Sequence, residues 1–360
     1  MTTSADVLVV GAGLSGLAAT FLLAEMGRKV LVLEARDEPG GRIASVRDGG
    51  DWAGDLGPTW IWPDFQPSIK HWIPRLDLQL DEQFSQGLTL VERGGEQPIQ
   101  RVNIPEQAGS QRIVGGPQAL IDALCDRLVP GTLQAGAGVT EVHVQSEQGE
   151  VRCVDSRGKA YTAEQVIIAT PLRIAARDIQ FEPSLPDELT RKLSAAPTWM
   201  ARHAKVVIRY ESAFWRAQGL TGRLLSAVGP LAEVHDHCGP GGEPPALFGF
   251  AAWPPSQRQN HASEWDEAIE AQLVRCYGPQ AANPVSITTK DWALDQWTTT
   301  ESDLEGPAAH PDVLPEMLRR GHWHQRLWFA SAETAQRDPG LIAGALASAE
   351  RVAKAVLNAR

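Results

Sequence analysis

The sequence predicts an α/β fold in which helices cover a parallel sheet, together with a smaller α+β domain. The short apolar run Val7–Val10 precedes a segment of helical periodicity at 14–26 and a second apolar run at 29–34, which is the order strand, helix, strand. Further strand-like runs at 139–144 and 326–330 adjoin helical segments, so distant parts of the chain can contribute to one sheet.

The length and composition indicate a globular protein of two domains. A chain of 360 residues exceeds the usual size of one domain, and 43% hydrophobic with 21% charged residues is an ordinary globular balance. The net charge of -11 argues against nucleic acid and anionic lipid as partners and weakly favours a cationic ligand.

The cysteines and the N-terminus predict a cytoplasmic protein. The four cysteines form no CxxC pair, which favours reduced thiols over a disulfide framework or a zinc ribbon. The first residues lack a basic signal region, and no apolar run reaches the roughly 18 residues of a membrane span, so we expect no membrane association.

The remaining elements follow from periodicity and from turn residues. We expect loops, short strands and one helix over 60–111, and a mixed α+β region over 174–320. The expected strands lie at 139–144, 151–154, 160–162, 165–169, 204–210, 246–252 and 326–330. The expected helices lie at 118–128, 262–276 and 340–357.

A glycine-rich turn joins the first strand to the first helix. Gly11-Ala-Gly13-Leu-Ser-Gly16 has G-x-G-x-x-G spacing, and Glu34 ends the next strand, which is the Rossmann-like dinucleotide-binding pattern. The helix N-terminus can bind phosphate, while Glu34 can accept ribose hydroxyls and disfavours a 2′-phosphate. The predicted cofactor-binding residues of this unit are Gly11, Gly13, Leu14, Ser15, Gly16, Glu34 and Ala35.

A second motif follows directly, at residues 36–45. Gly40 and Gly41 allow close backbone approach, while Arg36 and Arg42 can neutralise phosphate charge. The segment resembles the R-x-x-x-G-G-R-x-x-[ST] continuation of flavin-containing amine oxidases, phytoene desaturases and protoporphyrinogen oxidases. In those families it belongs to FAD binding, so the resemblance implies FAD rather than NAD.

The C-terminal part is similar to the amine oxidase family as well. Residues 327–335 resemble its F-A-G-T-E segment, which implies that Glu333 faces the flavin ribityl chain, although Ser331 stands where the family has glycine. Residues 340–345 resemble its glycine-spaced helix start near the flavin pyrimidine, which places Leu341 and Ile342 at the cofactor.

The same resemblance implies further site residues. The strand 204–210 resembles the family strand that delivers a lysine to the flavin edge, so Lys205 is the predicted catalytic residue; the alternative is a lysine that snorkels to solvent. Further cofactor contacts are implied for Gly57, Pro58, Thr59, Trp60, Val139, Ala169 and Thr170. Trp60, Trp62 and Trp297 are predicted to line the substrate site, with packing in the core as the alternative for the first two.

Three departures from the family pattern affect the expected site. Leu341 stands where monoamine oxidases commonly have one tyrosine of an aromatic pair. Residues 295–301 contain no cysteine for covalent attachment, which implies noncovalent FAD. Only a short linker joins Trp72 to Gly115, where larger relatives have a helical insertion, so the active site is expected to be open.

Two histidine-containing segments carry side chains that can ligate metals. His235-Asp-His-Cys238 and His322-Trp-His324 lack a second pair at metal-ligand spacing, and we interpret both as loops and expect no metal.

Together the residues predict a discontinuous FAD-binding domain and a substrate domain. The first comprises residues 1–75, 112–173 and 325–360, and the second comprises 76–111 and 174–324. The resemblance implies oxidation of an amine by hydride transfer to flavin N5, with reoxidation by oxygen to give peroxide. The alternatives are an FAD-dependent desaturase, an NAD(P)H oxidoreductase of the same superfamily, or a flavin-binding partner protein of low turnover.

Overall fold

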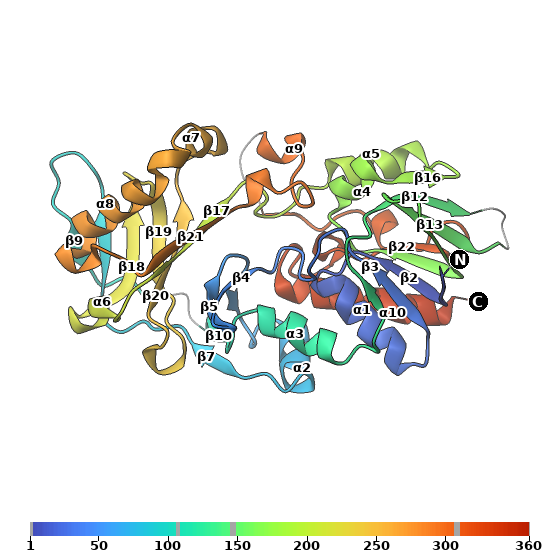
Figure 1. Ribbon diagram of the computed structural model, residues 1–360, viewed down its shortest axis with the longest axis horizontal. Helices are drawn as coiled ribbons and strands as arrows, with labels where there is room; N and C mark the ends of the chain where they lie inside the picture. The colour runs from blue at the N-terminus through green and yellow to red at the C-terminus, as the bar shows by residue number, and fades with distance from the viewer. Residues whose placement is uncertain (1–2, 106–108, 145–148, 306–309, 360) are drawn as a thin grey trace.

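The computed structural model describes residues 3–105, 109–144, 149–305 and 310–359 of the chain. The molecule is elongated, with one structural region at each end of its long axis (Figure 1). One region contains both chain ends and a parallel sheet covered by helices, and the other is built on a large, mostly antiparallel sheet.

The parallel sheet contains five strands that come from four distant parts of the chain. Its order is β11 (Leu133–Gln134), β3 (Val30–Leu33), β2 (Val7–Val10), β15 (Gln165–Ile168) and β22 (Leu327–Phe329). Val7 and Val9 of β2 pack into one hydrophobic core, while Leu8 and Val10 pack into another. Both faces of the sheet are therefore buried, as the unbroken apolar run predicts.

Helices cover one face of this sheet and a second sheet covers the other. The helices are α1 (Leu14–Glu25), α2 (Pro67–Arg75), α3 (Gln118–Asp126) and α10 (Ile342–Asn358). The second sheet has the order β1 (Thr3–Ser4), β14 (Ala160–Ala163), β13 (Val151–Asp155), β12 (Val139–Val144) and β16 (Gln180–Glu182). Leu189 and Leu193 of α5 (Asp187–Ala195), which follows α4 (Leu172–Asp178), belong to the same core as this second sheet.

The large sheet forms the other region. Its order is β21 (Ser286–Asp291), β17 (Ala204–Arg209), β20 (Ala246–Ala251), β19 (Leu231–Asp236), β18 (Leu220–Ser226), β8 (Leu88–Glu92) and β9 (Gln100–Val102). Trp265, Ile269 and Leu273 of α8 (Trp265–Tyr277) pack on one face through the predicted helical spacing. The short helices α6 (Phe214–Ala217) and α7 (Pro255–Asn260) belong to the same region as the large sheet.

Short elements between residues 45 and 113 lie between the two regions. They are the hairpin β4 (Ser45–Asp48) and β5 (Asp51–Asp55), and the small sheet β6 (Trp60–Ile61), β10 (Gln111–Ile113) and β7 (Leu80–Glu82). Leu56 packs with Val207 and Phe248 of the large sheet in a small core of its own. Helix α9 (Glu301–Leu304) and the single-turn η4 (Trp292–Leu294) and η6 (Ala332–Thr334) complete the surroundings of the site.

The elements predicted from periodicity are confirmed, with small differences at their ends. Helix α10 begins at Ile342, two residues later than expected, because Gly340 has a positive φ of 78° that a helix cannot contain. The loop interpretation of residues 235–238 is wrong for its first half, since His235 and Asp236 end strand β19.

The predicted domain division stays a prediction. The pairing of β16 with β12 and the packing of α5 favour assigning residues 174–196 to the first domain rather than ending that segment at 173.

Candidate functional site

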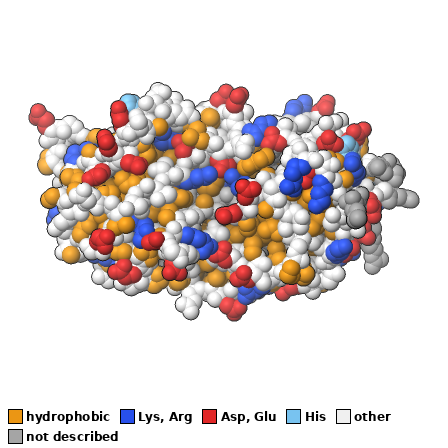
Figure 2. Space-filling model, in the orientation of Figure 1, with side chains coloured by type: hydrophobic (Ala, Val, Ile, Leu, Met, Phe, Trp, Pro, Cys, Tyr) orange, Lys and Arg blue, Asp and Glu red, His pale blue; other side chains and the backbone are white. Residues whose placement is uncertain are grey.

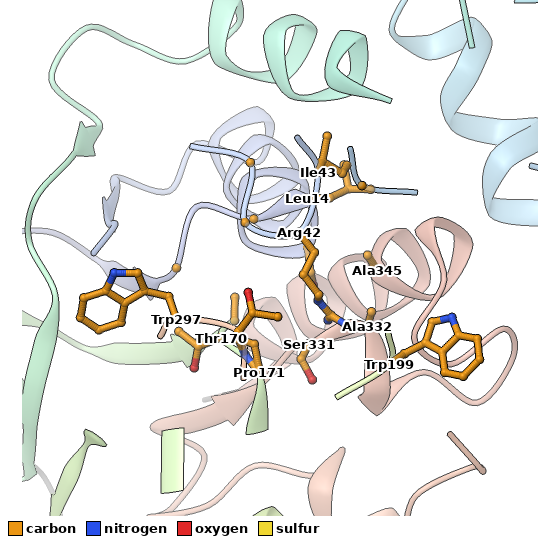
Figure 3. A pocket seen from close by; sticks show the side chains of 18 of the residues that line it. Leu14, Arg42, Ile43, Thr170, Pro171, Trp199, Trp297, Ser331, Ala332 and Ala345 are labelled. Carbon is orange, nitrogen blue, oxygen red and sulfur yellow. The ribbon is translucent and has the colours of Figure 1, made fainter. Parts of the chain in front are cut away.

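A cavity of about 380 Å³ lies at the carboxyl ends of the parallel strands and extends to the large sheet (Figure 3). Ligands of open α/β sheets bind at this edge, and the volume is within the range of small-molecule sites. Every predicted site residue lines the cavity except Gly16 and Glu333. Segments separated by more than 300 positions in the sequence therefore meet at one site.

Main-chain atoms of the glycine-rich turn line one part of the cavity. Gly11 has a φ of 103°, which favours glycine, and a methyl group on it would come within 3.2 Å of the Ala169 carbonyl group. A methyl group on Gly16 would lie 2.0 Å from the Gly11 oxygen, so Gly16 allows close packing of α1 on the turn rather than lining the cavity. Helix α1 has no side-chain cap at Gly13, which leaves its first N–H groups for a phosphate.

Glu34 is buried and fixed at the end of β3. Its carboxylate accepts a hydrogen bond from the Ala12 N–H at 2.6 Å and another from the Arg36 N–H at 2.9 Å. A carboxylate oxygen has a further lone pair to accept a ribose hydroxyl. Its predicted role toward the ribose agrees with this position and stays a prediction.

Both motif arginines make bidentate ion pairs within the protein. Arg42 donates to Glu333 at 2.6 and 3.0 Å, and Arg36 donates to Asp295 at 2.9 and 2.7 Å. Glu333 is buried and does not line the cavity, whereas Arg42 reaches the cavity near Ser331 and Ala332 (Figure 3). Both guanidinium groups thus already have an anionic partner within the protein, and their predicted phosphate role stays a prediction.

Buried hydroxyl groups without a partner support a bound cofactor. Among the residues that the structure describes, Thr59 Oγ1, Thr170 Oγ1 and Ser331 Oγ are buried and make no hydrogen bond, and all three residues line the cavity. Leaving such groups unpaired is costly, so a polar ligand that bonds to them fits the site. With the glycine cradle, these residues fit the FAD that the sequence implies.

Lys205 lies in the cavity wall, on strand β17. The residue is only 5% exposed, so the alternative of a lysine that snorkels to solvent is wrong. Its ammonium group donates to the Gly57 carbonyl oxygen at 2.5 Å and lies over the rings of Phe250 and Phe248, 5.2 and 5.6 Å from their centroids. Burial lowers the pKa of Lys205 to about 8, against an opposite effect of the Asp55 carboxylate.

Aromatic side chains surround the part of the cavity near Lys205. The Trp60 ring is stacked on Phe250, with centroids 6.2 Å apart, and its N–H donates to Gln83 at 2.8 Å. Trp62, Trp199 and Trp292 line the same cavity. Trp60 and Trp62 thus border the cavity, and their contact with substrate stays a prediction.

Trp297 lies at a different place from the other predicted substrate residues. Its ring is 3.5 Å from the position that a methyl group on Gly138 would take, and Ala35 is the other close neighbour of that position. Figure 3 shows Trp297 at the end of the cavity opposite to Trp199. Its position favours a contact with the cofactor rather than with the substrate.

Several lining residues were not found from the sequence. Phe250 faces the site because it pairs with Lys205 across β17 and β20, a register that no local motif encodes. Trp199 lies in a loop, where its ring is held against Gly340 and His310. For Trp199 the sequence signal was the high tryptophan content, which does not say which tryptophans meet.

Two wider properties complete the description. No helix in the described part of the chain combines the length and apolar character needed to cross a membrane. On the face shown in Figure 2, acidic and basic side chains are interspersed and apolar side chains appear between them.

Comparison with known families gives two matches. Residues 9–76 match the model of an NAD(P)-binding Rossmann-like domain, and residues 95–357 match that of flavin containing amine oxidoreductases. The second match covers well over half of the chain.

Individual relatives are distant but span the whole chain. The flavin-containing amine oxidase A of Sus scrofa is 24% identical, over 98% of this chain and 85% of its own. The solved structure of wild-type putrescine oxidase bound to putrescine has a TM-score of 0.80 at 20% identity, over 99% of this chain and 100% of its own. Cyclohexylamine oxidase from Brevibacterium oxydans also gives 0.80 at 20% identity, over 98% of both chains. These two likenesses confirm the predicted fold.

Proposed function

Because the chain belongs to the family of flavin containing amine oxidoreductases, we propose that it oxidises a monoamine with an apolar substituent to an imine, with oxygen as the acceptor. FAD, when bound, supplies the redox chemistry: it accepts a hydride from the amine α-carbon and passes two electrons to oxygen to give peroxide. The observation that supports the proposal best is the buried cation of Lys205 among aromatic rings in the cavity wall.

The charges of the cavity favour a neutral amine as the reacting form. The lysine ammonium repels a protonated amine, which has to lose its proton before it can approach. Among the described lining residues the carboxylates are Glu34 and Asp178. Glu34 accepts two backbone N–H groups and is assigned to the ribose of FAD, and Asp178 is paired with Arg177 at 2.6 and 2.8 Å, so both carboxylates have other partners than an ammonium group.

The same charges argue against a diamine substrate. A second ammonium group in the cavity would need an anionic partner to offset its desolvation. Asp55 is buried and acts on Lys205, but it does not line the cavity. The walls near Lys205 are instead formed by Trp60, Phe250 and Trp292. Such walls stabilise an apolar substituent by about 0.8 kcal/mol for each buried CH₂ group.

Lys205 supports the proposed use of oxygen as the electron acceptor. A buried cation held by the Gly57 carbonyl stabilises negative charge that develops on oxygen as it is reduced. Because the side chain is already buried and positioned before oxygen arrives, little reorganisation is needed.

An anaerobic substrate screen tests the proposal. Purified protein is mixed without oxygen with benzylamine, putrescine or NADH, and the absorbance of oxidised flavin is followed. We expect benzylamine to bleach the flavin well before putrescine does, and admission of oxygen to restore the colour with one peroxide formed per amine oxidised.

The alternatives give different results in the same screen. An NAD(P)H oxidoreductase is bleached by NADH and not by amines, and a desaturase responds only to its unsaturated-ring substrates. A flavin-binding partner of low turnover is bleached by none of them. Bleaching by putrescine in preference to benzylamine leaves amine oxidation standing but contradicts the monoamine assignment.

A further inference from the structure

The segment 295–299, between η4 and α9, is tied to the cofactor domain by an arginine of the second FAD motif. The Arg36 guanidinium donates two hydrogen bonds to Asp295 and a third to Thr298 Oγ1 at 3.2 Å. Asp295 also accepts from Lys290 Nζ at 2.7 Å. Both terminal nitrogens of Arg36 are thus directed at this segment.

Asp295 also organises the turn of the segment. Its side chain accepts the Trp297 N–H at 3.1 Å, and its carbonyl oxygen accepts the N–H groups of Thr298 and Thr299. Burial alone would raise the pKa of Asp295, but the hydrogen bonds from Arg36 and Lys290 outweigh it and lower the pKa to about 2. The carboxylate is therefore charged at any ordinary pH.

A second arginine holds the backbone of the segment. Arg177 of α4 donates to the Gln296 carbonyl oxygen at 2.7 Å and to that of Thr299 at 3.2 Å. The segment is thus held by two arginines that lie outside it.

The fixed segment contributes two side chains to the cavity, Trp297 and Thr298. The Trp297 ring lies 3.5 Å from the position that a methyl group on Gly138 would take, and Ala35, the residue after Glu34, borders the same position. In a Rossmann-like fold the acid at the end of the second strand marks the adenosine ribose. The indole therefore stands at the adenosine end of the site.

We propose that Trp297 and Thr298 form an additional binding subsite for the adenosine half of FAD, and that Arg36 and Asp295 are its positioning residues. In this arrangement the charge of Arg36 acts on the cofactor through Asp295 rather than directly on the phosphates. The apolar face of Trp297 covers the adenosine, as aromatic rings do in other nucleotide sites.

Release of FAD from the holoenzyme tests the subsite without any substrate. The holoenzyme is diluted, and the rise of free-flavin fluorescence gives the release rate. We expect Asp295→Asn and Trp297→Leu each to speed release by about 10-fold or more, on the scale for losing charged hydrogen bonds or a stacked ring.

Asp291→Asn is the matched control. It breaks the largely buried bidentate pair between Asp291, at the end of β21, and Arg258 of α7, and neither residue lines the cavity. We expect a comparable fall of the melting temperature with FAD release unchanged. If Asp291→Asn speeds release as much as Asp295→Asn does, general loosening explains the effect and the subsite is rejected.

A double-mutant cycle separates indirect action of Arg36 from direct phosphate binding. If Arg36 acts through Asp295, Arg36→Met speeds release in the wild-type background and adds nothing in the Asp295→Asn background. Equal effects in both backgrounds would mean that Arg36 acts on the phosphates, which overturns its positioning role. Wild-type release from Trp297→Leu would overturn the subsite itself. The proposal depends on FAD and not on the amine, so its failure is distinct from failure of the proposed function.

Discussion

The cofactor end and the substrate end of the cavity are built in different ways. At the cofactor end, short contiguous segments provide backbone groups and paired charges, as in Gly11–Gly16 and Gly40–Arg42. At the substrate end, single side chains such as Trp60, Lys205 and Phe250 come from three different strands. A phosphate-binding turn needs a fixed local geometry, whereas an apolar wall needs only volume and shape. We therefore expect substitutions at the first end to cost more than those at the second.

The largest expected effect is that of Gly16→Ala at the cofactor end. Its methyl group would lie 2.0 Å from the Gly11 oxygen, a backbone atom that cannot move without distorting the turn. We expect the free energy of unfolding to fall by about 3 kcal/mol or more and FAD to be lost on purification. Denaturant unfolding and the flavin content of the purified protein measure these effects.

Gly27→Ala is the control for Gly16→Ala. Gly27 has a positive φ of 79° but open space around it, so we expect a loss of only about 1 kcal/mol, with FAD retained. A Gly16→Ala variant that keeps its FAD and stability would show that the two ends of the cavity tolerate change equally.

Next in size is Lys205→Met, at the substrate end. Removing the cation is expected to slow reoxidation of reduced flavin by about 10²-fold while folding and FAD binding survive. The pKa of about 8 lies below the ordinary lysine value, so the ammonium is present below pH 8 and is lost as the pH rises through 8. Reoxidation of the wild type should therefore slow as the pH rises through 8, and reoxidation of the variant should lack this pH dependence.

Lys192→Met, on the exposed face of α5, is the control for loss of a lysine and should reoxidise as the wild type does. Stopped-flow mixing of anaerobically reduced protein with oxygen at several pH values makes the measurement. An Lys205→Met protein that is loaded with FAD and reoxidises normally would remove Lys205 from the chemistry.

Glu34→Gln tests the cofactor end without steric change. The substitution keeps the size of the side chain but removes the charge that accepts the Ala12 and Arg36 N–H groups and, as we expect, the ribose hydroxyls. FAD binding should weaken by about 1–3 kcal/mol, the scale for hydrogen bonds to a charged group. Equilibrium titration of FAD gives the value, and Glu164→Gln, in a surface pair with Arg28, should leave it unchanged. An unaltered affinity in Glu34→Gln would place the ribose elsewhere.

The smallest expected effect is that of Trp60→Phe. The shorter ring can still stack on Phe250 but loses the hydrogen bond to Gln83. We expect a cost of about 1 kcal/mol or less, seen as a KM for benzylamine that rises a few-fold while kcat is kept. Steady-state kinetics decide this, and a large fall in kcat would mean that Trp60 has a role beyond forming the wall.

The same contrast explains how far the sequence predicted the site. The residues of the G-x-G-x-x-G turn and of the G-G-R motif could be named because their spacing reports a local backbone geometry. Lys205 was predicted from its strand and its resemblance to a family segment. Phe250 and Trp199 could not be named, because the first depends on pairing with Lys205, 45 positions away, and the second on a loop packed against Gly340.

In the fold, too, local features were predicted and long-range contacts were not. The continuous apolar run of β2 predicted a strand buried on both faces, and that is confirmed. The partners of Arg36 lie some 260 positions away, so the sequence motif could indicate its charge but not where that charge is directed.

The hydrogen bond from Ser15 to the carbonyl oxygen of Ala330 spans 315 positions of the chain. Helix α10, which packs against α1 in the same core, is made later still. During synthesis on the ribosome, the N-terminal unit with its phosphate-binding turn lacks these contacts until β22 and α10 have been made. Contacts of such sequence separation are slow to form. We therefore expect the cofactor to bind late in biosynthesis, after translation of most of these 360 residues.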